Sequence, residues 1–317
     1  VQDEISEAIA MSLVGDLERA EHSRVQRRAP ENLEAWGLYQ RALPLIYNFT
    51  REDCAEARTM LAHAVELDSH FAPAVARLSE VGTWEVLYEW TDDPERTLDA
   101  SIAGARRAVA LDSLDAQARI SLSFALMTAG DGLGALEEAR HAVELNPSMP
   151  FALAIHAYHR HIAGYSPEES IAFVQRALRL SPHDPMEWLF YDVLSGAYFN
   201  AGRFVEGVEA GRRLIVLSPN YYWGYLWTAM NKVGLGRIEE ARELVGQARR
   251  VKPELSFDLA RKCLGTMAPD VDDRFVAALR KAGLEIADDL KVVQSATEDK
   301  PQLESSTPSI AVLPFTN

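Results

Sequence analysis

Cysteines and long apolar runs are scarce in this sequence of 317 residues. Only two cysteines occur, Cys54 and Cys263, and their wide separation argues against a disulfide framework or a zinc site. Low cysteine content fits a reducing compartment, so we expect a cytoplasmic protein. No apolar stretch reaches the roughly 18 residues of a membrane span. The chain starts at Val1 without a signal-peptide pattern, and we expect it to be part of a longer protein.

Basic residues are also in deficit, because 47 acidic residues face 32 basic ones and the formal net charge is −15. Such a charge disfavours nucleic acid or an anionic membrane as the main partner. Hydrophobic residues make up 48% of the chain, which predicts a folded core rather than disorder.

What the sequence does contain is a repeat. Six segments end in an apolar helix turn followed by a small or polar stop, and four of them add proline. Their last residues fall at positions 69, 113, 147, 182, 219 and 253, which gives spacings of 44, 34, 35, 37 and 34. A tetratricopeptide repeat (TPR), a pair of antiparallel helices, has about 34 residues.

Small residues recur in phase inside these units. Ala135 and Ala142 precede the third stop, and Ala241 and Ala248 occupy the same places before the sixth. Two helices can approach closely only where small side chains face each other. Gly130 stands where a tight turn is needed between the two helices of its unit.

The fold class predicted is therefore all-α, a right-handed TPR superhelix of about six helix pairs spanning residues 30–253. The 44-residue spacing marks an expanded second unit, whose first helix we expect to continue through Trp84 to Trp90. The expected helix pairs are 32–48 with 51–67, 71–90 with 95–111, 115–129 with 132–146, 149–163 with 167–180, 184–201 with 203–217, and 221–235 with 237–251.

Both ends of the array look like helical caps. Residues 1–29 carry apolar residues at i+4 spacing from Ile5 to Leu17, which predicts an amphipathic helix leading into the array. Residues 254–284 predict capping helices, the last of them with Asp270 as its N-cap.

The tail differs in character. Residues 285–308 are acidic and rich in Ser, Thr and Pro, and predict a flexible linker. Residues 309–317 contain the apolar run Ile310 to Leu313, which predicts one orphan β-strand of an otherwise missing α/β domain. That neighbouring α/β domain is an expected partner, because a lone strand is not stable.

Three motifs carry a family resemblance: VQDEISEAIA (1–10), PENLEAWGLYQRALPLIYNFT (30–50) and SIAVLPFTN (309–317). They resemble the TPR region of bacterial multidomain signalling proteins, namely TPR-bearing class III adenylate/guanylate cyclases and related winged-helix transcription regulators. In that family the IAVLPF strand comes first, whereas here it comes last. The 285–317 segment therefore lies upstream of the array, starts a second module, or marks an artificial boundary.

We expect no catalytic residue, no cofactor and no metal in this segment. A GxxxxGK[ST] phosphate loop is absent from the sequence. The resemblance implies that a cyclase would use metal-binding aspartates on a ferredoxin-like sheet, and the repeats do not provide one. His156 and His159 could share a helix face with His161 nearby, but a metal site needs three or four ligands. A polar inner wall is the simpler interpretation.

The densest aromatic stretch runs from Tyr221 to Trp227. Trp223 and Trp227 are four residues apart and, in this register, project into the concave groove that first helices line in the TPR family. Aromatic anchors there could hold a peptide. The alternative is packing against Trp188 and Phe199 of the fifth unit. The full predicted groove wall comprises Glu80, Trp84, Phe124, Met127, His156, His159, Trp223, Trp227 and Asn231.

The sequence thus predicts a regulatory scaffold that binds a protein or peptide segment in its groove. One alternative is the regulatory or dimerisation region, a homodimer included, of a class III cyclase whose catalytic domain lies outside this segment. Another is small-molecule sensing in the groove.

Overall fold

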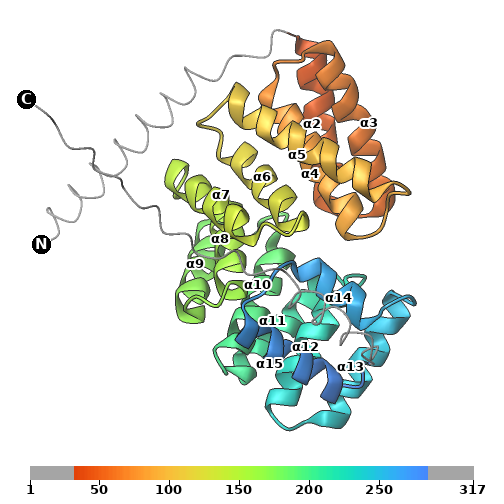
Figure 1. Cartoon of the computed structure of the whole chain (residues 1–317), viewed down its shortest axis with the longest axis vertical. Helices are drawn as coiled ribbons and strands as arrows, with labels where there is room; N and C mark the ends of the chain where they lie inside the picture. The colour runs from red at the N-terminus through yellow and green to blue at the C-terminus, as the bar shows by residue number, and fades with distance from the viewer. Residues whose placement is uncertain (1–31, 285–317) are drawn as a thin grey trace, which may run out of the picture.

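The computed structural model describes residues 32–284, and every regular element within that range is a helix (Figure 1). The predicted segments 1–29, 285–308 and 309–317 lie outside the described residues. The helices are α2 (Leu33–Asn48), α3 (Arg51–Leu67), α4 (Ala72–Leu87), α5 (Pro94–Leu111), α6 (Ala116–Thr128), α7 (Gly132–Leu145), α8 (Pro150–Ile162), α9 (Pro167–Leu180), α10 (Glu187–Asn200), α11 (Phe204–Leu217), α12 (Tyr222–Gly234), α13 (Ile238–Val251), α14 (Phe257–Leu264) and α15 (Pro269–Lys281).

From α2 to α13 each even-numbered helix packs against the odd-numbered helix that follows it, and neighbouring pairs stack along the chain (Figure 1). The two kinds of helix bury different amounts of surface. Every residue of α12 from Tyr222 to Lys232 is buried, whereas α13 buries only one stripe, Ala241, Val245 and Ala248. The reason is position, because α12 lies between α10, α11, α13 and α15. This is the layering of a helical-repeat array.

The predicted small-residue contacts are confirmed. Ala135, Ala142, Ala241 and Ala248 are all fully buried. Gly130 has a φ of 85°, a left-handed conformation that glycine adopts without steric cost. The repeated alanines therefore set the close helix approach within a pair, and the glycine makes the turn that reverses the chain.

The predicted continuation of the 71–90 helix to Trp90 is wrong. Helix α4 ends at Leu87, and Glu89 takes a left-handed conformation with a φ of 58°. The backbone N–H of Trp90 then donates to the carbonyl of Glu85 at 2.8 Å, which satisfies a carbonyl at the helix end. Trp90 therefore leaves the helix axis and becomes available to another surface.

The C-terminal helices pack back onto earlier pairs (Figure 1). The N–H of Ala268 donates to the carbonyl of Ile162 at the end of α8, and Thr266 Oγ1 donates to the carbonyl of Gly130 after α6. Arg274 Nη1 reaches the carbonyl of Asn200 at the end of α10 at 2.7 Å. Helix α15 starts at Pro269 with Ala268 as N-cap, so the expectation of Asp270 as cap is wrong by two residues.

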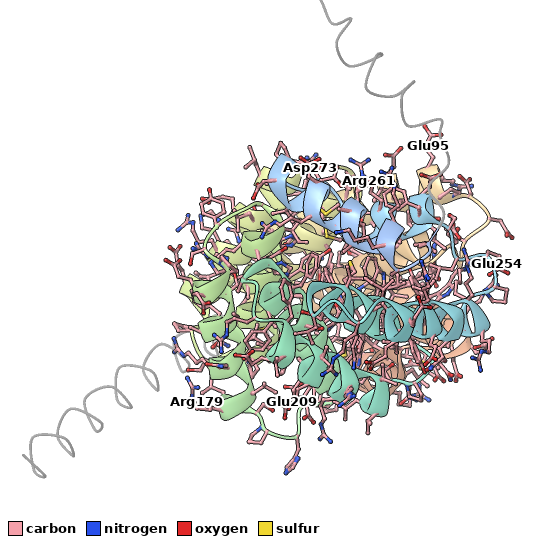
Figure 2. All side chains as sticks on the ribbon, turned by 90° about the horizontal axis from the view of Figure 1, so that it is seen from below. Glu95, Arg179, Glu209, Glu254, Arg261 and Asp273 are labelled. Carbon is pink, nitrogen blue, oxygen red and sulfur yellow. The ribbon has the colours of Figure 1, made fainter. Side chains whose placement is uncertain are left out.

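Charged side chains lie around the outside of the array. In the view of Figure 2, Arg179 and Glu209 lie at the outer rim and point away from the helices. No helix within residues 32–284 has both the length and the apolar content needed to cross a membrane.

Candidate functional site

All nine residues of the predicted groove wall are buried. None of Glu80, Trp84, Phe124, Met127, His156, His159, Trp223, Trp227 or Asn231 exposes more than 8% of its surface. They come from α4, α6, α8 and α12, as predicted, and the structure brings some of them together: Trp84 lies edge-on to Phe124 at 6.4 Å between ring centroids.

Helix α15 covers two of the three tryptophans of this wall, Trp223 and Trp227. Phe275 stacks on Trp223 with 6.1 Å between ring centroids and meets Trp227 edge-on at 6.3 Å. Trp227 also lies 6.4 Å from Phe199 of α10, as the packing alternative expected. The turn before α15 covers Met127, because a Cβ on Gly265 would lie 3.0 Å from its side chain. In this conformation the chain itself covers that part of the predicted groove wall.

The polar members of the wall face neighbouring helices. Asn231 Nδ2 donates to the carbonyl of Ser195 in α10 at 3.1 Å. His159 Nε2 lies 2.8 Å from Ser123 Oγ, and the His156 ring meets Phe173 of α9 edge-on. Burial lowers the pKa of His156 to about 4 and of His159 to about 3, so both are neutral at pH 7. Within residues 32–284 no three His, Cys, Asp or Glu side chains gather in a way that could hold a metal ion.

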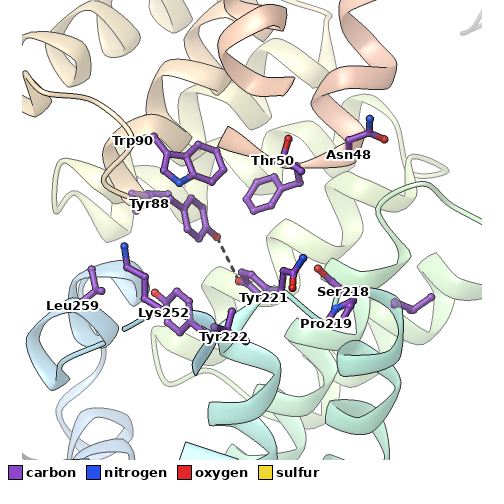
Figure 3. A pocket seen from close by; sticks show the side chains of 15 residues that line it. Asn48, Thr50, Tyr88, Trp90, Ser218, Pro219, Tyr221, Tyr222, Lys252 and Leu259 are labelled. Atoms are coloured by element: carbon purple, nitrogen blue, oxygen red, sulfur yellow. Dashed lines mark hydrogen bonds between the residues drawn. The ribbon is translucent and has the colours of Figure 1, made fainter. Parts of the chain in front are cut away.

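A pocket remains open elsewhere in the array (Figure 3). Its volume is about 380 Å³, and it lies between the ends of α2 and α4 and the start of α12. Figure 3 shows Trp90 and Tyr88 on one side, facing Tyr221 and Tyr222 on the other. We call it the aromatic pocket; its lining residues are Asn48, Phe49, Thr50, Leu87, Tyr88, Trp90, Leu217, Ser218, Pro219, Asn220, Tyr221, Tyr222, Val251, Lys252 and Leu259.

Phe49 is the centre of the aromatic contacts. Its ring centroid lies 5.0 Å from both Trp84 and Tyr88, and 4.8 Å from Trp188 of α10. These distances fall in the range where aromatic pairs attract each other beyond simple burial. Phe49 also lies 6.4 Å from the Tyr221 ring at the start of α12, so it joins the first two helix pairs to the fifth and sixth.

Two strained backbone positions flank the pocket. Phe49 has a φ of 53° and Glu89 a φ of 58°, and among the described residues they are the two non-glycines with positive φ. This conformation costs about 1 kcal/mol or more for a residue with a Cβ. At Phe49 the left-handed turn ends α2, and the N–H of Phe49 donates to the carbonyl of Ile46. The turn places the Phe49 ring against Trp84 and Tyr88.

The electrostatics of the pocket are mild. Lys252 Nζ lies 3.7 Å from Glu89 and 3.8 Å from Glu254, distances too long for hydrogen bonds. The hydroxyls of Tyr88 and Tyr221 lie 3.4 Å apart. Burial, together with the nearby Asp192 carboxylate, raises the pKa of Tyr221 well above its usual value, so the phenol stays protonated. The pocket thus offers aromatic surface with one ammonium at its edge.

Sequence reasoning found part of this pocket. It singled out Tyr221 and Tyr222 as members of the aromatic stretch, but it missed Phe49, Tyr88 and Lys252. Those three lie at helix ends, where the repeat pattern carries no signal. The signal that was available was the aromatic residue Phe49 in the turn between the predicted helices 32–48 and 51–67, where a chain reversal was expected.

No protein-family model matches the chain. It is 31% identical over 142 residues to a protein of Rhizobium meliloti (strain 1021) named "Putative adenylate cyclase 3", which is 45% of this chain and 24% of that protein. It is 26% identical over 86 residues to the Hsp70-Hsp90 organising protein of Plasmodium falciparum, 27% of this chain and 33% of that one. The matches thus span a third or less of these curated relatives.

Two solved structures share the fold. The APC/C hetero-tetramer Cut9-Hcn1 gives a TM-score of 0.54 at 16% identity, with 78% of this chain and 46% of that chain covered. PilW, titled a widely conserved type IV pilus biogenesis factor, gives 0.50 at 16% identity, with 69% and 98% covered. At this identity they show the fold alone, which is that of a TPR-type helical-repeat protein, as predicted.

Proposed function

We propose that this chain is a protein–protein interaction and regulatory scaffold of a bacterial signalling protein, and that it binds a partner segment at the aromatic pocket. The observation that carries the proposal is the pocket itself: an aromatic-lined opening of about 380 Å³ in the array, flanked by two strained residues. Strained backbone clusters at binding sites, where the fold holds it in place. In domain terms, residues 30–253 form about six repeats and residues 254–284 cap them.

The residue types suit a peptide anchor. Trp90 and Tyr88 are half-buried, so their rings are held by the fold and still present surface to a partner. Tryptophan and tyrosine dominate binding energy at interfaces because they bury a large area and lose little rotamer freedom. We infer that an apolar side chain of the partner inserts between Trp90 and Tyr222.

Partner contact with Trp223 and Trp227 has a further requirement. Phe275 lies on both rings, so a partner reaches them only after α15 moves away. The groove wall predicted from sequence therefore stands as a second, displaceable binding surface of the same scaffold.

The test is a display selection of peptides on the 317-residue chain. Trp90→Ala should abolish binding of most selected peptides, since it removes one wall of the pocket. Leu133→Ala is the matched control, because Leu133 is 76% exposed on α7 and does not line the pocket. Peptides that bind the Trp90→Ala variant as tightly as the parent would refute the pocket assignment.

The alternative is the regulatory or dimerisation region of a cytoplasmic class III adenylate/guanylate cyclase. The Rhizobium relative, 31% identical over 142 residues, favours it. Under this alternative the present chain incubated with ATP and Mn²⁺ yields no cyclic nucleotide, while Trp90→Ala in the longer protein changes cyclase output. A linked winged-helix domain would instead make the scaffold part of a transcription regulator.

Small-molecule sensing is supported by volume alone. A cavity of about 380 Å³ falls within the roughly 300–1,000 Å³ of known ligand pockets. A thermal-shift screen with small molecules separates this function from peptide binding: compounds that raise the Tm of the parent but not of Trp90→Ala would favour sensing.

A further inference from the structure

A second, smaller cavity lies next to the aromatic pocket and shares a wall with it. Its volume is about 50 Å³. Leu87, Tyr88 and Tyr221 line both spaces, and the hydroxyls of Tyr88 and Tyr221 lie 3.4 Å apart. We call this space the inner cavity. Because the wall consists of side chains, a ligand in the aromatic pocket can reach the inner cavity when the two hydroxyls move apart.

Asp192 of α10 is the one carboxyl group among the described residues that line the inner cavity. The residue is 5% exposed, and the described residues form no hydrogen bond or ion pair with its side chain. Its Oδ1 is fully covered, whereas Oδ2, also without a partner, is not. A buried polar group without a partner costs free energy, so the fold carries this carboxyl at a loss of stability. Oδ2 is the atom that a ligand can reach.

Aromatic rings surround this carboxyl. Those that line the inner cavity belong to Tyr88, Phe124, Tyr158, Tyr221 and Trp223. None of the described lining residues is a lysine, an arginine or a histidine. The faces of aromatic rings carry partial negative charge and attract cations. The rings and the carboxyl therefore favour the same kind of ligand, an organic cation.

The size of the inner cavity limits the cation that fits. A cavity needs about 10–15 Å³ to hold one water molecule, so about 50 Å³ accepts a group of a few heavy atoms. The compact ammonium of lysine suits this space better than the wider, planar guanidinium of arginine. The apolar stem of a lysine can then lie along the rings of the aromatic pocket. The net charge of −15 also favours a basic partner.

We propose that the aromatic pocket and the inner cavity together bind a lysine side chain of the partner segment. Its ammonium donates to Asp192 Oδ2, and its stem passes between Tyr88 and Tyr221. This inference rests on the proposed scaffold function and names the chemistry of its partner. The lysine is a second anchor, next to the apolar side chain that inserts between Trp90 and Tyr222.

Binding of the ammonium is linked to loss of a proton from Asp192. Burial raises the pKa of this carboxyl to about 8, so most molecules hold it neutral at pH 7. The titratable groups that face it are phenols: Tyr88 after α4, Tyr158 of α8 and Tyr221 before α12. Helices α9 and α11 also pack on α10 but contribute no lining residue. The ammonium requires the ionised carboxylate, so affinity should rise with pH and level off above about 8.

The outer pocket contains one cation of its own. Lys252 lines the edge of the aromatic pocket but not the inner cavity. Its Nζ lies 3.7 Å from Glu89 and 3.8 Å from Glu254, and these carboxylates offset its repulsion of a second ammonium.

The test is a titration of the full chain with n-butylammonium, which has the length of a lysine side chain, followed by methyl NMR of ¹³C-methionine. Met127 lines the inner cavity, whereas Met230 does not and is fully buried. The amine should shift the Met127 signal with a Kd on the order of a millimolar at pH 8 and leave Met230 unmoved. The Kd at pH 6.5 should be at least about tenfold higher than at pH 8.5. An unmoved Met127 signal, or a Kd that does not change with pH, would overturn the inference.

Ligands of the same length separate charge from apolar contact. 1-Butanol has a neutral head and butyrate a negative one, and both should bind at least about tenfold more weakly than n-butylammonium at pH 8. Equal binding of 1-butanol would show that the cavity accepts any short apolar chain, and the cation site would be refuted.

Asp192→Asn is the decisive variant. It keeps the shape of the side chain and stays neutral, so it removes a buried charge and should fold. Its affinity for n-butylammonium at pH 8 should be at least about tenfold lower, without dependence on pH. Glu209→Gln is the matched control, because it removes the same charge from an exposed position at the outer rim (Figure 2). Equal binding by the parent and Asp192→Asn would refute the site.

The source of the ammonium is decided by N-acetyl-lysine methylamide, which adds a peptide backbone to the same side chain. It should bind at least as tightly as n-butylammonium; clearly weaker binding would overturn the lysine assignment in favour of a free amine. If the amine fails while selected peptides still depend on Trp90, the inference falls and the proposed function stands. Selected peptides that ignore Trp90→Ala, with amine binding that depends on Asp192, would refute the proposed function and leave the cation site standing.

Discussion

Helix α12 supplies aromatic rings to two regions that differ in what lies above them. Tyr221 and Tyr222 at its start line the open aromatic pocket, whereas Trp223 and Trp227, a few residues on, lie under Phe275 of α15. The residue types are alike in both regions. All four rings are buried, but Tyr221 and Tyr222 border a cavity that remains open, whereas α15 fills the space beside Trp223 and Trp227.

The largest expected effect comes from uncovering the second region. Phe275→Ala removes the ring that packs on Trp223, and Phe275 is only 1% exposed. Replacement of a fully buried phenylalanine costs about 3–5 kcal/mol, because transfer free energy is lost and a cavity remains. Urea unfolding followed by tryptophan fluorescence measures the loss of unfolding free energy.

The matched control for this variant is Trp36→Ala. Trp36 is 46% exposed on α2, so its loss should change the unfolding free energy by no more than about 0.5 kcal/mol. If Phe275→Ala were as mild as Trp36→Ala, α15 would not be docked on α12 and the contrast between the two regions would disappear.

The repeat itself could be read from sequence because its causes are local and periodic. Ala142 and Ala248 mark close helix contacts in every register that fits the spacing, and both are fully buried. The cover over Trp223 could not be read in this way. Phe275 lies about fifty residues further along the chain, and no periodic rule links the two positions. Phe49 was missed because a single aromatic at a helix end belongs to no pattern.

Asp192 of α10 lies between the two regions. It is 5% exposed and lines a small cavity with Tyr221 and Trp223. Burial raises the pKa of Asp192 to about 8, and the polar influence of the nearby Trp227 side chain only partly opposes the rise. At pH 6 the native carboxyl is therefore protonated while the unfolded one is ionised. The native state binds the extra proton, so stability must fall as pH rises from about 4 to about 8.

Asp192→Asn should remove this dependence. The variant keeps the shape and stays neutral, so its unfolding free energy at pH 8 should exceed that of the parent, on the order of 2–4 kcal/mol, with little difference at pH 4. Denaturant unfolding at a series of pH values measures both. The quantity to compare is the difference in unfolding free energy between the parent and Asp192→Asn, measured at pH 4.5 and at pH 8. If this difference were the same at both pH values, water would reach the carboxylate and the prediction would be wrong.

Phe49 tests how far the open pocket also supports the fold. Phe49→Ala and Phe49→Gly delete the same ring, but glycine also relieves the left-handed backbone at a φ of 53°. The free energy of unfolding of Phe49→Gly should therefore be about 1 kcal/mol higher than that of Phe49→Ala, although both variants are less stable than the parent. Thermal melts of the pair give the order. Alanine equal to or better than glycine would show that the turn relaxes when the ring is gone.

The smallest expected effect on stability is at Lys252. Its distances of 3.7 and 3.8 Å to Glu89 and Glu254 describe weak ion pairs, and both carboxylates are well exposed. Lys252→Gln should change the unfolding free energy by less than about 0.5 kcal/mol.

The effect of Lys252→Gln on binding should be larger, because the ammonium lies at the edge of the aromatic pocket, where a partner would remove water from it. Peptides selected on the parent should lose affinity for Lys252→Gln in low salt and less so in high salt. Phe275→Ala has the opposite expected effect: it lowers the stability of the protein but leaves the lining of the aromatic pocket intact. If Lys252→Gln lowered stability and left peptide affinity unchanged, the open region would be a packing surface like the covered one.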